Sequence, residues 1–105
     1  MWVQTISLKR LQREQRYIFQ PETGEEILIC WINEQVYAFS ALCPHHLFSL
    51  EKGFIDLEEF SIQCPLHQWR FDLESGKGLN QESCLHTYPT QIKAGKIQIK
   101  CPPNP

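Results

Sequence analysis

The sequence predicts a single small all-β domain. Short stretches rich in β-branched and aromatic residues recur along the chain, and turn signals separate them at intervals of roughly eight to twelve residues. No sustained amphipathic helix, internal repeat or low-complexity segment breaks this pattern. The length of 105 residues suits one domain with a modest hydrophobic core.

Strands are expected throughout the N-terminal part of the chain. Apolar alternation or a high content of β-branched and aromatic residues predicts them over 1–8, 15–19, 26–32 and 35–40. Residues 11–15 are polar and predict only a connection. Pro21 to Gly24 carries a turn signal. Asn33-Glu34 predicts a tight hairpin turn, after which the chain returns antiparallel and leads to Cys43.

The C-terminal part predicts shorter elements. Strands are expected over 55–62, 69–72, 85–88, 91–93 and 97–99. The last two are expected to pair across a turn at Ala94-Gly95. Leu50 and Phe54 are expected to be buried anchors, and the proline-rich tail after Lys100 predicts irregular structure.

Charge and composition exclude several classes of protein. The net charge is −2, with 10 basic and 12 acidic residues, so no basic face for nucleic acid is expected. No apolar stretch is long enough to cross a bilayer, and the first part of the chain lacks the pattern of a secretory signal. A cytoplasmic protein is therefore expected, where thiols stay reduced. In that setting the 5 cysteines indicate metal binding rather than disulfides.

Two short loops each offer one thiol and one imidazole. The first reads Cys43-Pro44-His45 and the second reads Cys64-Pro65-Leu66-His67. The proline after each cysteine fixes φ and stiffens its loop. Thiolate and imidazole bind iron and zinc, so these loops form a candidate metal site.

Two other interpretations of these loops stay open. Zinc binds sets of two cysteines and two histidines, although structural zinc sites usually pair Cys with Cys and His with His. The plainest alternative is a pair of buried thiols and a pair of surface imidazoles in unrelated loops. His46 adjoins a candidate ligand but is expected to face solvent, because neighbours on an extended loop point in opposite directions.

The pattern resembles the Rieske family of 2Fe-2S proteins over roughly residues 26–100. The resemblance is carried by Cys43-Pro44-His45, Leu50, Gly53, Cys64-Pro65-Leu66-His67, Trp69, Phe71-Asp72, Gly76, Leu85 and Tyr88-Pro89. It implies the Rieske fold, an antiparallel β base with an inserted cluster-binding subdomain at about residues 41–72. It also implies one 2Fe-2S cluster per chain. By the same resemblance, Cys43 and Cys64 bind the inner iron, while His45 and His67 bind the outer iron and form the electron exit.

The implied ligand set determines the charge of the cluster. Two ferric ions, two sulfides and two thiolates sum to zero with neutral imidazoles, so an added electron meets less repulsion than on a four-thiolate cluster. Such sites span roughly −150 to +300 mV. High-potential relatives carry a second cysteine in each ligand loop and two hydroxyls near sulfur. The matching positions here are Phe48, Leu66, Trp69 and Phe71, so the resemblance implies the low-potential, ferredoxin-type branch.

Two further departures concern the cover of the cluster and the docking surface. Leu47 stands where the family commonly has glycine. The third loop, between Gly76 and Tyr88, lacks the proline usually found near the cluster, and Gln81 to Cys84 stand there instead.

The remaining cysteines and aromatic residues are given ordinary structural roles. Cys30 is expected in the core and Cys101 at a strand end, while Cys84 is a structural or idle thiol. Trp69 and Phe71 are expected to pack and to shield the cluster from water. His86 is assigned no role.

These observations predict an electron carrier that is not itself an enzyme. The sequence offers no catalytic nucleophile, no acid–base pair and no room for a substrate domain. The expected donor is a reductase and the expected acceptor is an oxygenase or another reductase, with the carrier acting as a monomer. The alternatives are a non-catalytic small subunit of a reductase such as nitrite reductase, a redox sensor that uses the cluster or Cys84, and a zinc-stapled binding module.

Overall fold

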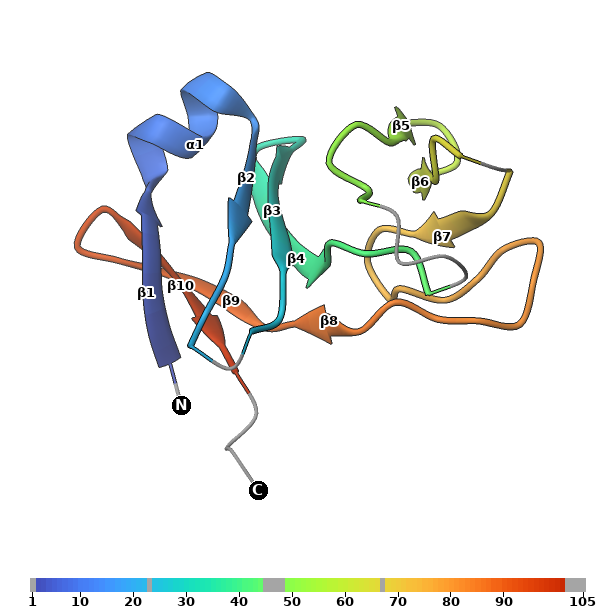
Figure 1. Cartoon of the computed structure of the whole chain (residues 1–105). Helices are drawn as coiled ribbons and strands as arrows, with labels where there is room; N and C mark the ends of the chain where they lie inside the picture. Colours follow the sequence, from blue (N-terminus) through green and yellow to red (C-terminus); the bar gives the residue numbers. More distant parts are fainter. Residues whose placement is uncertain (1, 23, 45–48, 67, 102–105) are drawn as a thin grey trace.

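Short antiparallel strands, joined by turns and loops, form most of the regular structure (Figure 1). The computed structural model describes residues 2–22, 24–44, 49–66 and 68–101. The elements are β1 (Trp2–Ser7), α1 (Leu8–Glu14), β2 (Arg16–Phe19), β3 (Ile27–Ile32), β4 (Gln35–Ser40), β5 (Phe54–Asp56), β6 (Ser61–Gln63), β7 (Arg70–Asp72), β8 (Thr87–Tyr88), β9 (Thr90–Lys93) and β10 (Lys96–Lys100). The all-β prediction is confirmed, with one short helix added.

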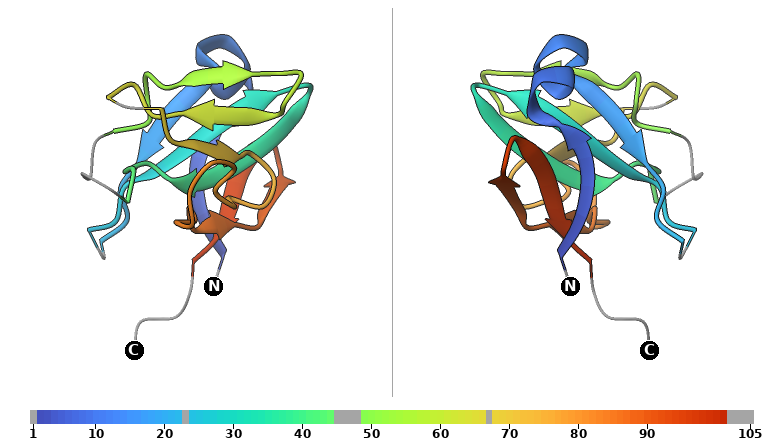
Figure 2. Two further views of the ribbon diagram at one scale, coloured as in Figure 1. Left: turned by 90° about the vertical axis from the view of Figure 1, so that its right-hand side faces the viewer. Right: turned by 90° about the vertical axis from the view of Figure 1, so that its left-hand side faces the viewer.

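The strands of the described residues form three antiparallel sheets. An outer sheet has the order β1-β10-β9, a central sheet the order β2-β3-β4-β8, and a small sheet the order β5-β6-β7. The chain leaves the central sheet after β4, builds the small sheet, and returns as β8, which pairs with β4. Viewed from the side of the small sheet, β5 and β6 lie across β3 and β4 (Figure 2).

Both predicted hairpins are confirmed. Asn33 and Glu34 have φ of 51° and 63° and join β3 to β4, as expected for a two-residue turn with both central residues left-handed. Ala94 and Gly95 have φ of 52° and 75° and join β9 to β10 in the same way. These turns fix the register of the β3–β4 and β9–β10 pairs.

The expected polar connection over 11–15 is wrong, because a helix occupies most of it. Ser7 caps α1, its side-chain oxygen accepting a hydrogen bond from the Arg10 N–H at 3.2 Å. Gln15 ends the helix with φ of 69° and donates its N–H to the Leu11 carbonyl at 2.6 Å. Leu11 is the fully buried residue of this 7-residue helix, so the apolar pattern is too short to indicate a helical period.

The prediction of one strand over 55–62 is also wrong, because a turn between Asp56 and Ser61 divides this segment into β5 and β6. The Asp56 carboxylate accepts hydrogen bonds from the N–H groups of Glu58 and Glu59 at 2.9 and 3.2 Å, which turns the chain between β5 and β6. Phe54 is 67% exposed, so it is not the buried anchor that was expected. Leu50 is fully buried, as predicted.

The two faces of β3 contribute to two different cores. Ile27 and Ile29 face the outer sheet, where they pack with Leu11, Ile97 and Ile99. Leu28 and Cys30 face the small sheet and belong to a second cluster. Burial on both faces explains why this strand reads as a continuous apolar run.

Candidate metal centre

The first ligand loop begins directly after β4. Leu42 and Ser49 form a bridge at its base, and Leu50 donates its N–H to the Ala41 carbonyl at 2.6 Å. Cys43 is fully buried just inside this closure. The predicted ligand His45, and with it His46, Leu47 and Phe48, lies outside the described residues.

The second ligand loop is the turn of the β6–β7 hairpin. Cys64 donates its N–H to the Trp69 carbonyl at 3.0 Å, which closes the loop at its base. The Cys64 side chain is 1% exposed, whereas Leu66 at the tip is 54% exposed. The predicted ligand His67 lies outside the described residues.

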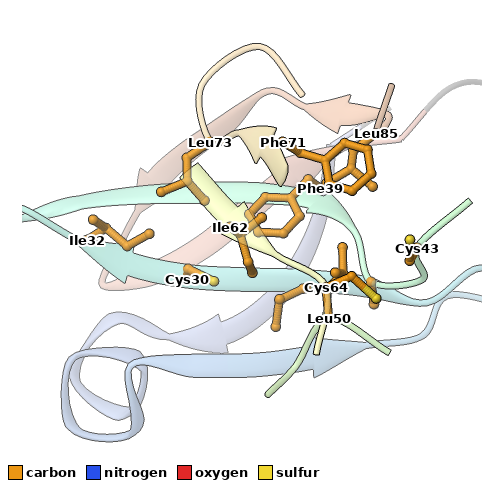
Figure 3. Close-up of a cluster of buried hydrophobic side chains, with 12 residues drawn as sticks. Cys30, Ile32, Phe39, Cys43, Leu50, Ile62, Cys64, Phe71, Leu73 and Leu85 are labelled. Atoms are coloured by element: carbon orange, nitrogen blue, oxygen red, sulfur yellow. The ribbon is translucent and has the colours of Figure 1, made fainter. Parts of the chain in front are cut away.

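The fold brings the two predicted cysteine ligands into one apolar cluster. Cys43 and Cys64 share it with Leu50, Ile62 and Phe71, and Figure 3 shows both thiols at the same end, beside Leu50. Two buried sulfur donors from separate loops fit the thiolate half of a metal site. Among the described residues, no group of three or more His, Cys, Asp or Glu is placed to hold a metal.

A glycine allows the stems of the two ligand loops to approach each other. A Cβ added to Gly53 would lie 2.7 Å from the Gln63 carbonyl oxygen and 3.0 Å from the Leu50 carbonyl oxygen. Gln63 precedes Cys64, and Gly53 ends the segment that follows the first loop. Any larger residue at Gly53 would therefore push the two stems apart.

Arg16 links the base to the first ligand loop, a role that sequence reasoning missed. Its Nη1 donates to the Glu51 carbonyl at 2.6 Å and to the Gly53 carbonyl at 2.9 Å. The partners are 35 and 37 residues away along the chain, so no local pattern could indicate the contact.

The packing roles expected for three residues are confirmed. Trp69 and Phe71 meet edge to face with centroids 6.5 Å apart, and both pack in the cluster with the two thiols. Cys30 is fully buried, and burial raises the pKa of its thiol to about 12. Cys84, by contrast, lies exposed in the third loop.

A hollow of about 450 Å³ flanks the first ligand loop and is lined in part by Pro44, His86 and Tyr88. The Tyr88 hydroxyl donates to the Glu25 carboxylate at 2.6 Å. Burial, followed by this carboxylate, raises the pKa of Tyr88 above its usual value. His86 packs edge to face on Tyr88 with centroids 4.6 Å apart, so both rings stiffen the strand that returns to the base.

The matches to known proteins agree with this arrangement. A family model described as the Rieske [2Fe-2S] domain matches residues 1–90. The chain belongs to the Rieske [2Fe-2S] domain family. Membership confirms the predicted Rieske fold and the predicted cofactor, one 2Fe-2S cluster per chain.

Relatives of this Rieske protein are ferredoxins. It is 31% identical over 86 residues to the ferredoxin component of the alkene monooxygenase system of Xanthobacter autotrophicus, covering 80% of this chain and 70% of that protein. It is 35% identical over 79 residues to the ferredoxin component of the naphthalene 1,2-dioxygenase/salicylate 5-hydroxylase systems of Ralstonia sp. This match covers 73% of this chain and 74% of that protein.

A solved Rieske structure shares the whole fold. The ferredoxin of carbazole 1,9a-dioxygenase from Nocardioides aromaticivorans IC177 has a TM-score of 0.82 and 28% identity, over 94% of this chain and 96% of that chain. The chain is thus an electron-transfer protein and not itself an enzyme. Within the described part of the chain, no helix combines the length and apolar composition needed to cross a bilayer.

Proposed function

We propose that the protein carries one electron at a time on a cluster held by four side chains, Cys43, His45, Cys64 and His67. The burial of two cysteines from separate loops in one apolar cluster is the observation that most directly supports this ligand set. Buried thiolates need positive charge beside them, because an uncompensated charge in an apolar environment is costly. Ferric ions supply that charge, and the bound cluster accepts and releases one electron.

The neighbouring side chains keep water away from the sulfur atoms. Leu50 and Phe71 are fully buried beside the cysteines, and Trp69 packs against the same cluster. None of these three side chains carries a hydroxyl that could donate to sulfur. We therefore place the reduction potential in the lower part of the range of roughly −150 to +300 mV for clusters with two histidine ligands.

Anaerobic purification tests the ligand set. We expect the purified protein to contain two iron and two sulfide ions per chain. After reduction with dithionite, it should give the EPR signal of low average g that is typical of a histidine-ligated cluster. Cys43→Ser and Cys64→Ser are expected to lose the cluster, whereas His45→Cys and His67→Cys shift any retained cluster to lower potential because a thiolate adds negative charge. A colourless protein that holds zinc or nothing after anaerobic reconstitution would contradict the proposal.

The other cysteines provide matched controls. Cys84→Ser changes an exposed thiol in the third loop, and Cys30→Ala changes a buried thiol in the same apolar cluster. Both variants are expected to keep the full iron content and the same EPR signal. Loss of the cluster in either would assign a ligand outside the two loops.

We infer that the electron comes from a reductase and passes to an oxygenase. The two relatives described above are components of oxygenase systems, which supports this direction of transfer. We expect the rate of oxygenase turnover to rise in proportion to the concentration of this protein. We also expect the protein to separate from both partners in gel filtration. Isolation in a fixed complex would favour a reductase subunit, and a partner affinity that changes on reduction would favour a sensor.

We also propose how the chain is organised in solution. Residues 1–105 form one domain whose cluster-binding subdomain spans about 41–72, and the protein acts as a cytoplasmic monomer. Sedimentation equilibrium of the holoprotein tests whether it is a monomer, for which a mass near 12.4 kDa is expected. Fractionation of cells that express the protein tests its compartment.

A further inference from the structure

The segment that follows the second ligand loop is held on its inner edge by the loop itself. Cys64 donates its N–H to the Trp69 carbonyl at 3.0 Å, and Gln63 pairs with Arg70 in the β6–β7 register. These contacts fix the chain on one side only. Gln68, which directly follows His67, is exposed and takes no part in these two contacts.

The third loop supplies the outer edge of the same segment. Asp72 donates its N–H to the Lys77 carbonyl at 2.8 Å, and Leu79 donates its N–H to the Arg70 carbonyl at 2.9 Å. Beyond Leu79 the backbone turns away, and the side chain of Asn80 continues the contact. Its Oδ1 accepts from the Arg70 N–H at 3.0 Å, and its Nδ2 donates to the Gln68 carbonyl at 2.6 Å.

The turn that presents Asn80 is tight. A Cβ added to Gly78 would lie 2.3 Å from the Ser83 carbonyl oxygen and 2.5 Å from the Gln81 carbonyl oxygen. The Gln81 side chain also accepts from the Ser83 N–H at 2.6 Å. Asn80 is therefore carried by a closed loop with little room to change its path.

We propose that Asn80 is a positioning residue for the second ligand loop. Its amide substitutes for a strand neighbour at Gln68 and Arg70, and so it holds the C-terminal stem of the loop beside His67 in one place. The task requires a donor and an acceptor on one short side chain, which asparagine offers and aspartate at neutral pH does not. This role rests on the proposed function, in which His67 is a ligand.

Two variants of the holoprotein separate the two hydrogen bonds. Asn80→Ala removes both, whereas Asn80→Asp keeps the acceptor for Arg70 and loses the donor to Gln68. Glu82→Gln is the matched control, since it changes an exposed side chain of the same loop without altering its size. All three are compared with wild type by amide hydrogen exchange, by iron release to a chelator, by EPR and by urea unfolding.

The expected pattern is local. In Asn80→Ala the Arg70 amide exchanges about tenfold faster, the scale of one lost hydrogen bond, and iron release accelerates by a similar factor. In Asn80→Asp the Arg70 amide stays protected while iron release still accelerates. Both variants broaden the EPR signal, because the histidine ligand is held less uniformly, and the urea midpoint stays near that of Glu82→Gln.

Distinct results would overturn the proposal. Unchanged iron release and EPR in both Asn80 variants would show that the contact does not position the ligand loop. A lowered urea midpoint without an EPR change would reduce Asn80 to a general stabilising residue. If wild type holds no cluster, the proposed function fails, and the Arg70 exchange rate in the apoprotein still tests whether Asn80 holds this segment.

Discussion

The two cores of the molecule are built by different means. The core between the outer and central sheets consists mainly of isoleucine from strands that pair over several residues, together with Leu11 of α1. The core under the small sheet includes Cys30, Cys43 and Cys64, and each strand of that sheet has 3 residues. Long strand pairs stabilise the base, whereas the small sheet covers a well-buried apolar core with short strands only.

Side chains that bond to backbone groups compensate in the small sheet. Asp56 turns the chain after β5, and Asp72 accepts from the Ser75 N–H and hydroxyl at 2.8 and 2.9 Å after β7. Arg16 holds the segment after the first ligand loop. We therefore expect the base to fold from its own packing and the small sheet to depend also on the bound cluster.

The largest expected effect comes from removing the cluster. In apoprotein prepared with a chelator under reducing conditions, amide exchange in β5, β6 and β7 should rise by roughly two orders of magnitude, because metal binding is coupled to folding of its site. Exchange in β3 and in its partner β4 should change little. Equal loss of protection in both regions would show that the whole chain depends on the cluster.

Two isoleucine truncations sharpen the comparison. Ile29 and Ile62 are both fully buried, the first in the base core and the second under the small sheet. Ile29→Ala should lower the free energy of global unfolding by about 2–5 kcal/mol. Ile62→Ala should mainly accelerate iron release and exchange in the small sheet. Identical losses of global stability would instead indicate one cooperative unit.

Arg16→Ala should have an intermediate effect. It removes two charged hydrogen bonds to backbone carbonyls and should destabilise the segment after the first ligand loop by about 1–3 kcal/mol. Exchange around Gly53 and iron release report that local change. Arg16→Lys keeps the charge and should recover part of the loss. Arg13→Ala, which changes an exposed residue of α1, is the control.

Alkaline pH should produce the smallest effect, through Cys30. The pKa of its thiol is about 12 in the folded protein and about 8.5 in an unfolded chain. The folded state therefore retains a proton that the unfolded state releases, so stability is full below about pH 8.5 and falls as pH rises toward 12. Between pH 9 and 10 the loss is about 1 kcal/mol. Urea midpoints of Cys30→Ala should show a shallower pH dependence. An equal slope would assign the loss to other groups whose pKa is raised, such as Tyr37, Tyr88 and Cys101.

Local patterns in the sequence predicted the parts of the fold that local chemistry determines. The apolar run of β3, the turn at Asn33-Glu34 and the paired cysteine loops each follow from neighbouring residues. Helix α1 was missed because a single fully buried residue gives no periodic signal. Phe54 is exposed because it neighbours Ile55 in β5 and so points to the opposite face, while Ile55 packs against the core.

The contacts that support the ligand loops were not predictable from sequence. Arg16 reads as an ordinary polar residue of a strand, and Asn80 reads as an ordinary loop residue. Their partners lie far along the chain and are backbone groups, which leave no signature in the residue types. The predicted cysteine ligands are recognisable from chemistry alone, whereas the residues that support their loops become recognisable only in the folded structure.

The pairing of the first and last strands has a consequence for how the domain joins other proteins. Trp2 lies opposite Lys100, so β1 begins beside the point where β10 ends, at one end of the outer sheet. Strands β1 and β10 lie away from the small sheet (Figure 1). A polypeptide fused at either end, or at both, would extend from the base and leave the ligand loops uncovered. The fold can therefore be inserted into a larger chain through two adjacent attachment points.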